Sequence, residues 1–94
     1  MNNKIQELAL QEAERYKQSY IAYCKANPGY IMHGDSMKQD AMEKASFCQN
    51  LEELEAMKTY YEIGSRQMNA KNSVHGFKFS REAINDLIKL IKNE

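Results

Sequence analysis

The chain has 94 residues, which is enough for one small domain. Lys and Arg together equal Asp and Glu at 13 each, and this balance argues against a protein that works by coating nucleic-acid phosphates or an anionic membrane. A hydrophobic fraction of 43% is typical of a globular domain and argues against disorder.

No stretch of the sequence approaches the roughly 18 continuous apolar residues of a membrane span. Residues 1–7 turn polar where a secretory signal peptide would turn apolar. The two cysteines, Cys24 and Cys48, are too few for the disulfide framework of a secreted domain. We therefore expect a cytoplasmic protein with no membrane partner.

The first predicted element is a helix over about residues 3–26. Apolar residues recur at steps of three and four from Ile5 to Cys24, which is the spacing of one helix face. The residue before a proline is pushed out of helical geometry, so Pro28 and Gly29 predict the end of this helix.

A second and longer helix is predicted over about residues 36–70. Ser36 and Gln39 fit a capping box, in which each side chain binds a free backbone amide of the other residue. Neither proline nor glycine follows until Gly64. A glycine inside a helix costs ~1 kcal/mol relative to alanine, so a kink or a helix end at Gly64 is the alternative to a continuous helix.

A third and shorter helix is predicted over about residues 81–92. Ser80 is its expected cap, and Phe79 and Ile84 flank that cap with the spacing of a hydrophobic staple. The preceding residues 71–78 are interpreted as an irregular loop.

Together these elements predict an all-α fold, in which a long antiparallel helical hairpin and a short C-terminal helix form a three-helix bundle. A hairpin that turns near residue 31 would place Leu8 beside Leu54. The same register separates the two cysteines by on the order of 15 Å. A disulfide needs α-carbons within about 7 Å, so we expect two free and mostly buried thiols.

The predicted hairpin has unequal arms. The second helix would be ~50 Å long and the first ~35 Å, which leaves one end of the second helix uncovered. That end carries Tyr60 and Tyr61. Either the C-terminal helix or a second copy of the chain would cover it, and the small size of the core favours a homo-oligomer.

Motifs for catalysis or for cofactors are missing from the sequence. His33 and His75 stand alone, without other residues at metal-ligand spacing. The four glycines form no phosphate-binding loop. A cysteine on a helix is usually a small core residue. We therefore predict a protein that is not an enzyme and that binds neither a metal nor a cofactor.

Tyrosine is the residue type that points to a surface. The six tyrosines are Tyr16, Tyr20, Tyr23, Tyr30, Tyr60 and Tyr61. A tyrosine has a large apolar ring and a polar tip, and it is favoured in protein interfaces. The alternative is that each ring lines the edge of the core with its hydroxyl in water. For the group as a whole, we predict a surface that binds another protein.

The leading functional hypothesis is a protein–protein interaction module that acts as a regulator, adaptor or inhibitor. In its length, its low Pro and Gly content and its lack of motifs, the chain resembles small accessory proteins of phages and other mobile elements. The second hypothesis is a pocket between subunits, in which the tyrosines and Arg15, Lys17 and Lys25 bind a nucleotide-like anion. The third, for which the charge balance offers little support, is weak nucleic-acid binding through the C-terminal helix.

Overall fold

The computed structural model describes residues 4–29, 33–67 and 73–93 of the chain. Within these ranges the chain forms four helices and no strand. The helices are α1 (Lys4–Ala26), α2 (His33–Ala45), α3 (Leu51–Gln67) and α4 (Ser73–Lys92). The prediction of an all-α fold is confirmed. The predicted number of three helices is wrong, because the second predicted helix is divided in two.

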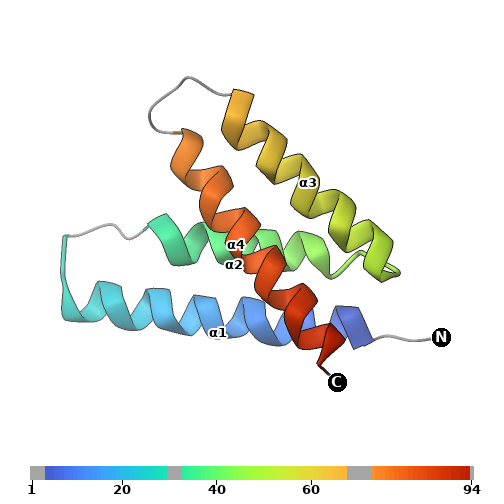
Figure 1. The fold of residues 1–94 in the computed structure, drawn as a ribbon. Helices are drawn as coiled ribbons and strands as arrows, with labels where there is room; N and C mark the ends of the chain where they lie inside the picture. The colour runs from blue at the N-terminus through green and yellow to red at the C-terminus, as the bar shows by residue number, and fades with distance from the viewer. Residues whose placement is uncertain (1–3, 30–32, 68–72, 94) are drawn as a thin grey trace.

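The four helices form two antiparallel pairs (Figure 1). One pair is α1 with α2, and the other is α3 with α4, which crosses α2 and reaches α1. In the described part of the chain, α3 packs chiefly on α4, and its backbone closely approaches α1 or α2 at few points. The C-terminal helix is therefore the central element of the fold and not a short cap on a hairpin.

The first helix agrees with its predicted range. Its buried residues are Ile5, Ala9, Ala13 and Tyr16, which are spaced four, four and three residues apart. Its last turn continues to Asn27, whose backbone N–H donates to the carbonyl of Tyr23 at 2.9 Å. Gly29 then has a φ of 85°, a left-handed conformation that favours glycine, and the helix ends here as the Pro-Gly pair predicted.

A turn at residues 46–50 divides the predicted helix over residues 36–70. At the start of the turn, backbone hydrogen bonds tighten as they do at many helix ends, for example from Cys48 N–H to the carbonyl of Ala45 at 2.9 Å. Asn50 then caps α3, because its Oδ1 accepts from the N–H of Glu53 at 2.9 Å. The carboxylate of Glu53 reaches back and accepts from the N–H of Gln49 at 2.6 Å.

The starts of α2 and α4 also differ from the predictions. The first begins at His33, so Ser36 lies inside the helix and is not its cap. The second begins at Ser73, so part of the predicted loop over residues 71–78 is helical. Ser80 lies within α4 and is buried, so the predicted cap and staple there are wrong.

Two glycines explain why α4 starts earlier than its sequence indicates. Gly64 lies inside α3, which continues to Gln67, and a Cβ atom at this position would lie 3.0 Å from the ring of Phe77. A Cβ atom at Gly34, in α2, would lie 3.3 Å from the ring of Phe79. We name these two contacts the glycine seam. They hold the first half of α4 on two neighbouring helices, whereas its Ser-Val-His-Gly sequence alone favours a loop.

Buried residues of all four helices form one core cluster, and α4 contributes Ala83, Ile84, Leu87 and Ile88. Leu54 belongs to this cluster, and Leu8 packs against it. The predicted hairpin with one continuous second helix is wrong, because the turn at residues 46–50 interrupts that helix. Both cysteines are free, as predicted, but each is half-buried rather than mostly buried.

Candidate functional site

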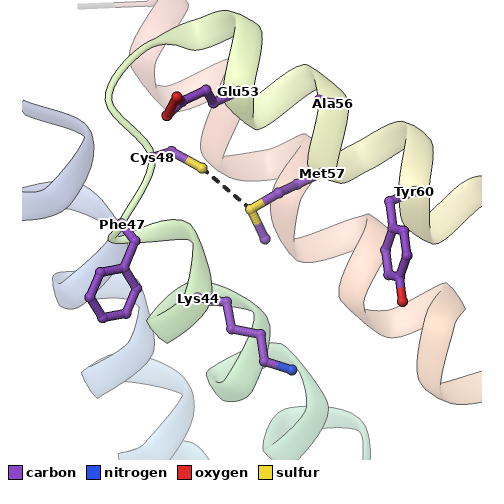
Figure 2. Close-up of a pocket in the computed structure, with 7 residues that line it drawn as sticks. All are labelled: Lys44, Phe47, Cys48, Glu53, Ala56, Met57 and Tyr60. Carbon is purple, nitrogen blue, oxygen red and sulfur yellow. Dashed lines mark hydrogen bonds between the residues drawn. The ribbon is translucent and has the colours of Figure 1, made fainter.

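An open groove of about 400 Å³ lies at the bend between α2 and α3. We name it the elbow groove. Its lining residues are Lys44, Phe47, Cys48, Glu53, Ala56, Met57 and Tyr60. Figure 2 shows Lys44 and Phe47 on the α2 side and Met57 and Tyr60 on the facing side of α3. Since its walls come from both sides of the turn, the groove exists only when the chain bends there.

Two sulfur atoms meet at the base of the elbow groove. The thiol of Cys48 donates to the sulfur of Met57, with the two atoms 3.3 Å apart. Burial raises the pKa of the Cys48 thiol, and the negative charge of Glu53 adds to this effect. Burial and this neighbouring charge both favour the neutral thiol, which packs against Met57 as a small side chain.

Large apolar side chains stand open to water at the rim. The side chain of Phe47 is 83% exposed and that of Tyr60 is 65% exposed. Ala56, Tyr60 and Ile63 follow one another at steps of four and three residues, and all three are exposed, so they form an apolar stripe along the outer face of α3. A contiguous exposed apolar surface of this kind marks an interaction site in many soluble proteins.

The ring of Tyr60 is held by other aromatic rings. Its centroid lies 5.4 Å from that of Tyr61 and 6.3 Å from that of Phe77, and both pairs have an edge-to-face geometry. Such pairs stabilise an arrangement by about 0.5–1.5 kcal/mol beyond the area they bury. The ring of Tyr60 is thus held at the rim by contacts within the chain.

The charge near the groove is mainly negative. Between residues 40 and 55 the sequence has one basic residue, Lys44. The acidic residues in this range are Asp40, Glu43, Glu52, Glu53 and Glu55. The ammonium of Lys44 lies 2.9 Å from a carboxylate oxygen of Asp40, which raises the pKa of the lysine. Of the two charged residues that line the groove, Lys44 is thus paired with Asp40, and Glu53 accepts the N–H of Gln49.

The predicted tyrosine surface does not form as one patch. Tyr16 and Tyr61 are buried in the core, with 5% and 8% of their surface exposed. Tyr20 and Tyr23 are half-buried, and Tyr30 lies outside the described residues. Tyr60 is therefore the one of the five described tyrosines that is largely open to a partner.

Tyr16 is covered by charged side chains that belong to the fold. The guanidinium of Arg15 lies 4.5 Å from the centroid of its ring, and the ammonium of Lys38 lies 5.6 Å from it. Lys38 also lies 3.9 Å from Glu82 and so ties α2 to α4. Burial raises the pKa of Tyr16. In this structure the ring of Tyr16 therefore contributes to the packing within the chain.

The three predicted anion-binding residues are not gathered by the fold. Arg15 forms two hydrogen bonds with the carboxylate of Glu12, at 2.8 and 3.2 Å, which raise its pKa. Lys17 and Lys25 are exposed. Residues two apart on a helix point to nearly opposite sides, so Arg15 and Lys17 of one α1 helix cannot both contact the same small ligand.

Comparisons with known proteins add no functional assignment: no family model, no curated protein and no solved structure matches this chain. Among the described residues, no three His, Cys, Asp or Glu side chains are grouped as they would be around a metal ion. None of the described helices is both long and apolar enough to cross a membrane.

Proposed function

We propose that this protein is a non-enzymatic interaction module that binds another protein through the elbow groove, as a cytoplasmic regulator, adaptor or inhibitor. The observation that carries the proposal is the 83% exposure of Phe47 beside a groove lined mainly by apolar side chains. Full burial of a phenylalanine side chain is worth ~1.5–3 kcal/mol, and the fold leaves this gain unused. A partner that covers Phe47 would obtain it.

The shape of the groove favours a helical partner. The floor around Met57 opens on to the exposed stripe of Ala56, Tyr60 and Ile63 along α3. A second helix that lies along this stripe would present its own apolar residues at the same three- and four-residue steps. The function is therefore recognition of an amphipathic helix, with Phe47 and Tyr60 as its aromatic anchors.

The charge at the rim defines the rest of the partner. Glu53 already accepts the N–H of Gln49, but Glu43, Glu52 and Glu55 are exposed carboxylates close to the groove in sequence. Lysines or arginines beside the apolar stripe of the partner would complement them. Attraction of this type steers association and weakens as the salt concentration rises.

The proposal is tested with a defined peptide. Fluorescence anisotropy would follow a synthetic amphipathic helix of about 18 residues, with leucines on one face and lysines beside them. We expect binding that weakens with salt and that falls about tenfold or more in Phe47→Ala, as for an interface anchor. The same substitution should change the free energy of unfolding by no more than about 0.5 kcal/mol, since the ring is exposed.

Two controls separate the groove from general stickiness. Leu10→Ala removes an apolar side chain that is 48% exposed on α1 and does not line the groove, so peptide binding should stay unchanged. A peptide with glutamates in place of the lysines should bind more weakly. Equal binding of both peptides, or equal binding by the wild type and Phe47→Ala, would refute the proposal.

A further inference from the structure

The turn between α2 and α3 contains no residue that breaks a helix. Residues 46–50 read Ser-Phe-Cys-Gln-Asn and contain neither proline nor glycine. Proline removes a helical hydrogen bond and glycine disfavours a helix, so their absence leaves the segment free to become helical. The pattern of the sequence itself predicts one helix through this region.

Helical hydrogen bonds reach the turn from both sides. The N–H of Ser46 bonds to the carbonyl of Met42 at 3.1 Å, which is the spacing of an α-helix. On the far side, the N–H of Leu54 bonds to the carbonyl of Asn50 at 3.4 Å with the same spacing. Straightening the turn therefore rearranges only a few backbone bonds between these two points.

The α3–α4 pair contacts the rest of the chain in a way that a second copy of the chain could reproduce. Its two helices pack on each other, and the pair meets the rest of the chain mainly through the contacts of α4 with α2 and α1 (Figure 1). These contacts do not depend on which chain supplies each side. A second copy offers the same surface as the first.

We propose that two copies of this chain exchange their α3–α4 pairs to form a dimer. In each chain the turn straightens, residues 33–67 become one helix of ~52 Å, and α4 packs on α1 and α2 of the other copy. The contacts of α4 with α2 and α1 are rebuilt between chains, the α1–α2 and α3–α4 pairs stay within each chain, and only the turn changes, as in other domain-swapped dimers. Because the elbow groove needs the bend, the dimer lacks it.

Two hydrogen bonds hold the bent form. In the cap, the N–H of Glu53 donates to Oδ1 of Asn50, and in the return bond the N–H of Gln49 donates to the carboxylate of Glu53. Asn50→Ala removes the cap and supplies the residue that best favours a helix. The substitution destabilises the bent monomer, which uses the cap, and not the straight helix, which does not. Since two monomers form each dimer, the association constant should rise at least about tenfold. Sedimentation equilibrium from about 10 μM to about 1 mM would measure it.

A matched pair of variants at Leu51 tests whether the turn is the hinge. Leu51 is the first residue of α3, a position at which proline is favoured, whereas in a straight helix it lies in the interior, where proline breaks the helix. Leu51→Pro, built in the Asn50→Ala background, should therefore abolish the dimer. Leu51→Ala in the same background loses the same leucine packing and should keep it.

A distance within one chain distinguishes exchange from a surface contact. Spin labels would be attached at Ser36→Cys and Thr59→Cys, both exposed positions, after replacement of the native cysteines by alanine. The labelled Asn50→Ala chain would be diluted into unlabelled chain. In a straight helix the two backbone positions lie ~35 Å apart, and in the bent form they lie closer.

The long distance should appear in the dimer fraction and be absent from the monomer. Three results would overturn the proposal. The first is an Asn50→Ala protein that stays monomeric up to about 1 mM. The second is a Leu51→Pro variant that dimerises as well as Leu51→Ala. The third is a dimer in which the distance between the two labels of one chain is the same as in the monomer. None of these measurements involves the helical peptide, so a failed groove proposal leaves this test unaffected.

Discussion

The glycine seam and the elbow groove are two aromatic regions that share α3 but differ in how they are covered. At the seam, the rings of Phe77 and Phe79 each lie against a helix at a glycine, where no side chain keeps them away. At the groove, Phe47 meets no such site and stands 83% exposed. Similar side chains are thus structural in one region and available to a partner in the other.

The difference teaches that burial in this fold depends on a matched neighbour more than on residue type. Tyr60 and Tyr61 are adjacent in sequence and 5.4 Å apart, yet Tyr61 is 8% exposed and Tyr60 is 65% exposed. Successive residues of a helix point about 100° apart, so the ring of Tyr61 lies in the core cluster while that of Tyr60 lines the groove. A function based on tyrosines as a class therefore does not follow from their number.

The largest expected effect falls on the covered side of the molecule. Leu87 is fully buried on α4, and Leu87→Ala should lower the free energy of unfolding by ~3 kcal/mol, from lost transfer energy and a residual cavity. Leu90→Ala on the same helix, where the side chain is 41% exposed, should cost less than about 1 kcal/mol. Urea denaturation would measure both values, and similar losses would show that α4 is not the centre of the fold.

A smaller effect is expected at the glycine seam itself. Gly64→Leu places side-chain atoms where the ring of Phe77 lies, since even a Cβ atom would be 3.0 Å away. Overpacking of this kind costs ~1–3 kcal/mol, although leucine recovers part of this through its helix propensity. In a Phe77→Ala background, the same substitution should be nearly neutral. A double-mutant cycle would measure the coupling, and additive effects would contradict the seam.

The sequence predicts much of the fold where local signals and tertiary packing agree. The first helix shows this, because its apolar spacing and the Pro-Gly pair both mark where it ends. The second predicted helix runs through residues 46–50 because this segment contains neither proline nor glycine. The pattern Asn50-x-x-Glu53 is an N-cap signal, and the structure uses it at that position.

At Gly64 the sequence indicates a possible helix end where the structure has a continuous helix. Gly64 indicates a possible helix end from propensity alone, but its missing side chain is what lets Phe77 pack there. The start of α4 depends on such contacts between distant segments, which no local pattern reveals.

The elbow groove could not be predicted from the sequence either, because it depends on the bend between α2 and α3. Phe47 and Met57 read as core residues of one long helix, and only the bend brings them into a groove. A binding surface formed by a turn cannot be predicted before that turn is recognised. The five described tyrosines could be identified, but their exposure could not, because it depends on which neighbour each ring meets.

The smallest effect would separate the two adjacent tyrosines by pH. Burial raises the pKa of Tyr61 above its ordinary value near 10, so ionisation is harder in the folded state than in the unfolded chain. Its contribution to stability is therefore complete below pH ~10 and is lost as the pH rises through the folded pKa. Tyr61→Phe should reduce this alkaline loss, measured by urea denaturation between pH ~8 and ~11.

Tyr60→Phe is the matched control, because it removes the adjacent hydroxyl, which is open to water. The two variants lose the same group from adjacent positions of α3, so the difference between them isolates the effect of burial, which is 8% exposure at Tyr61 and 65% at Tyr60. Equal alkaline behaviour of Tyr60→Phe and Tyr61→Phe would show that the two rings share one environment. That result would contradict the difference in burial between Tyr60 and Tyr61, and with it the distinction between a covered seam and an open groove along α3.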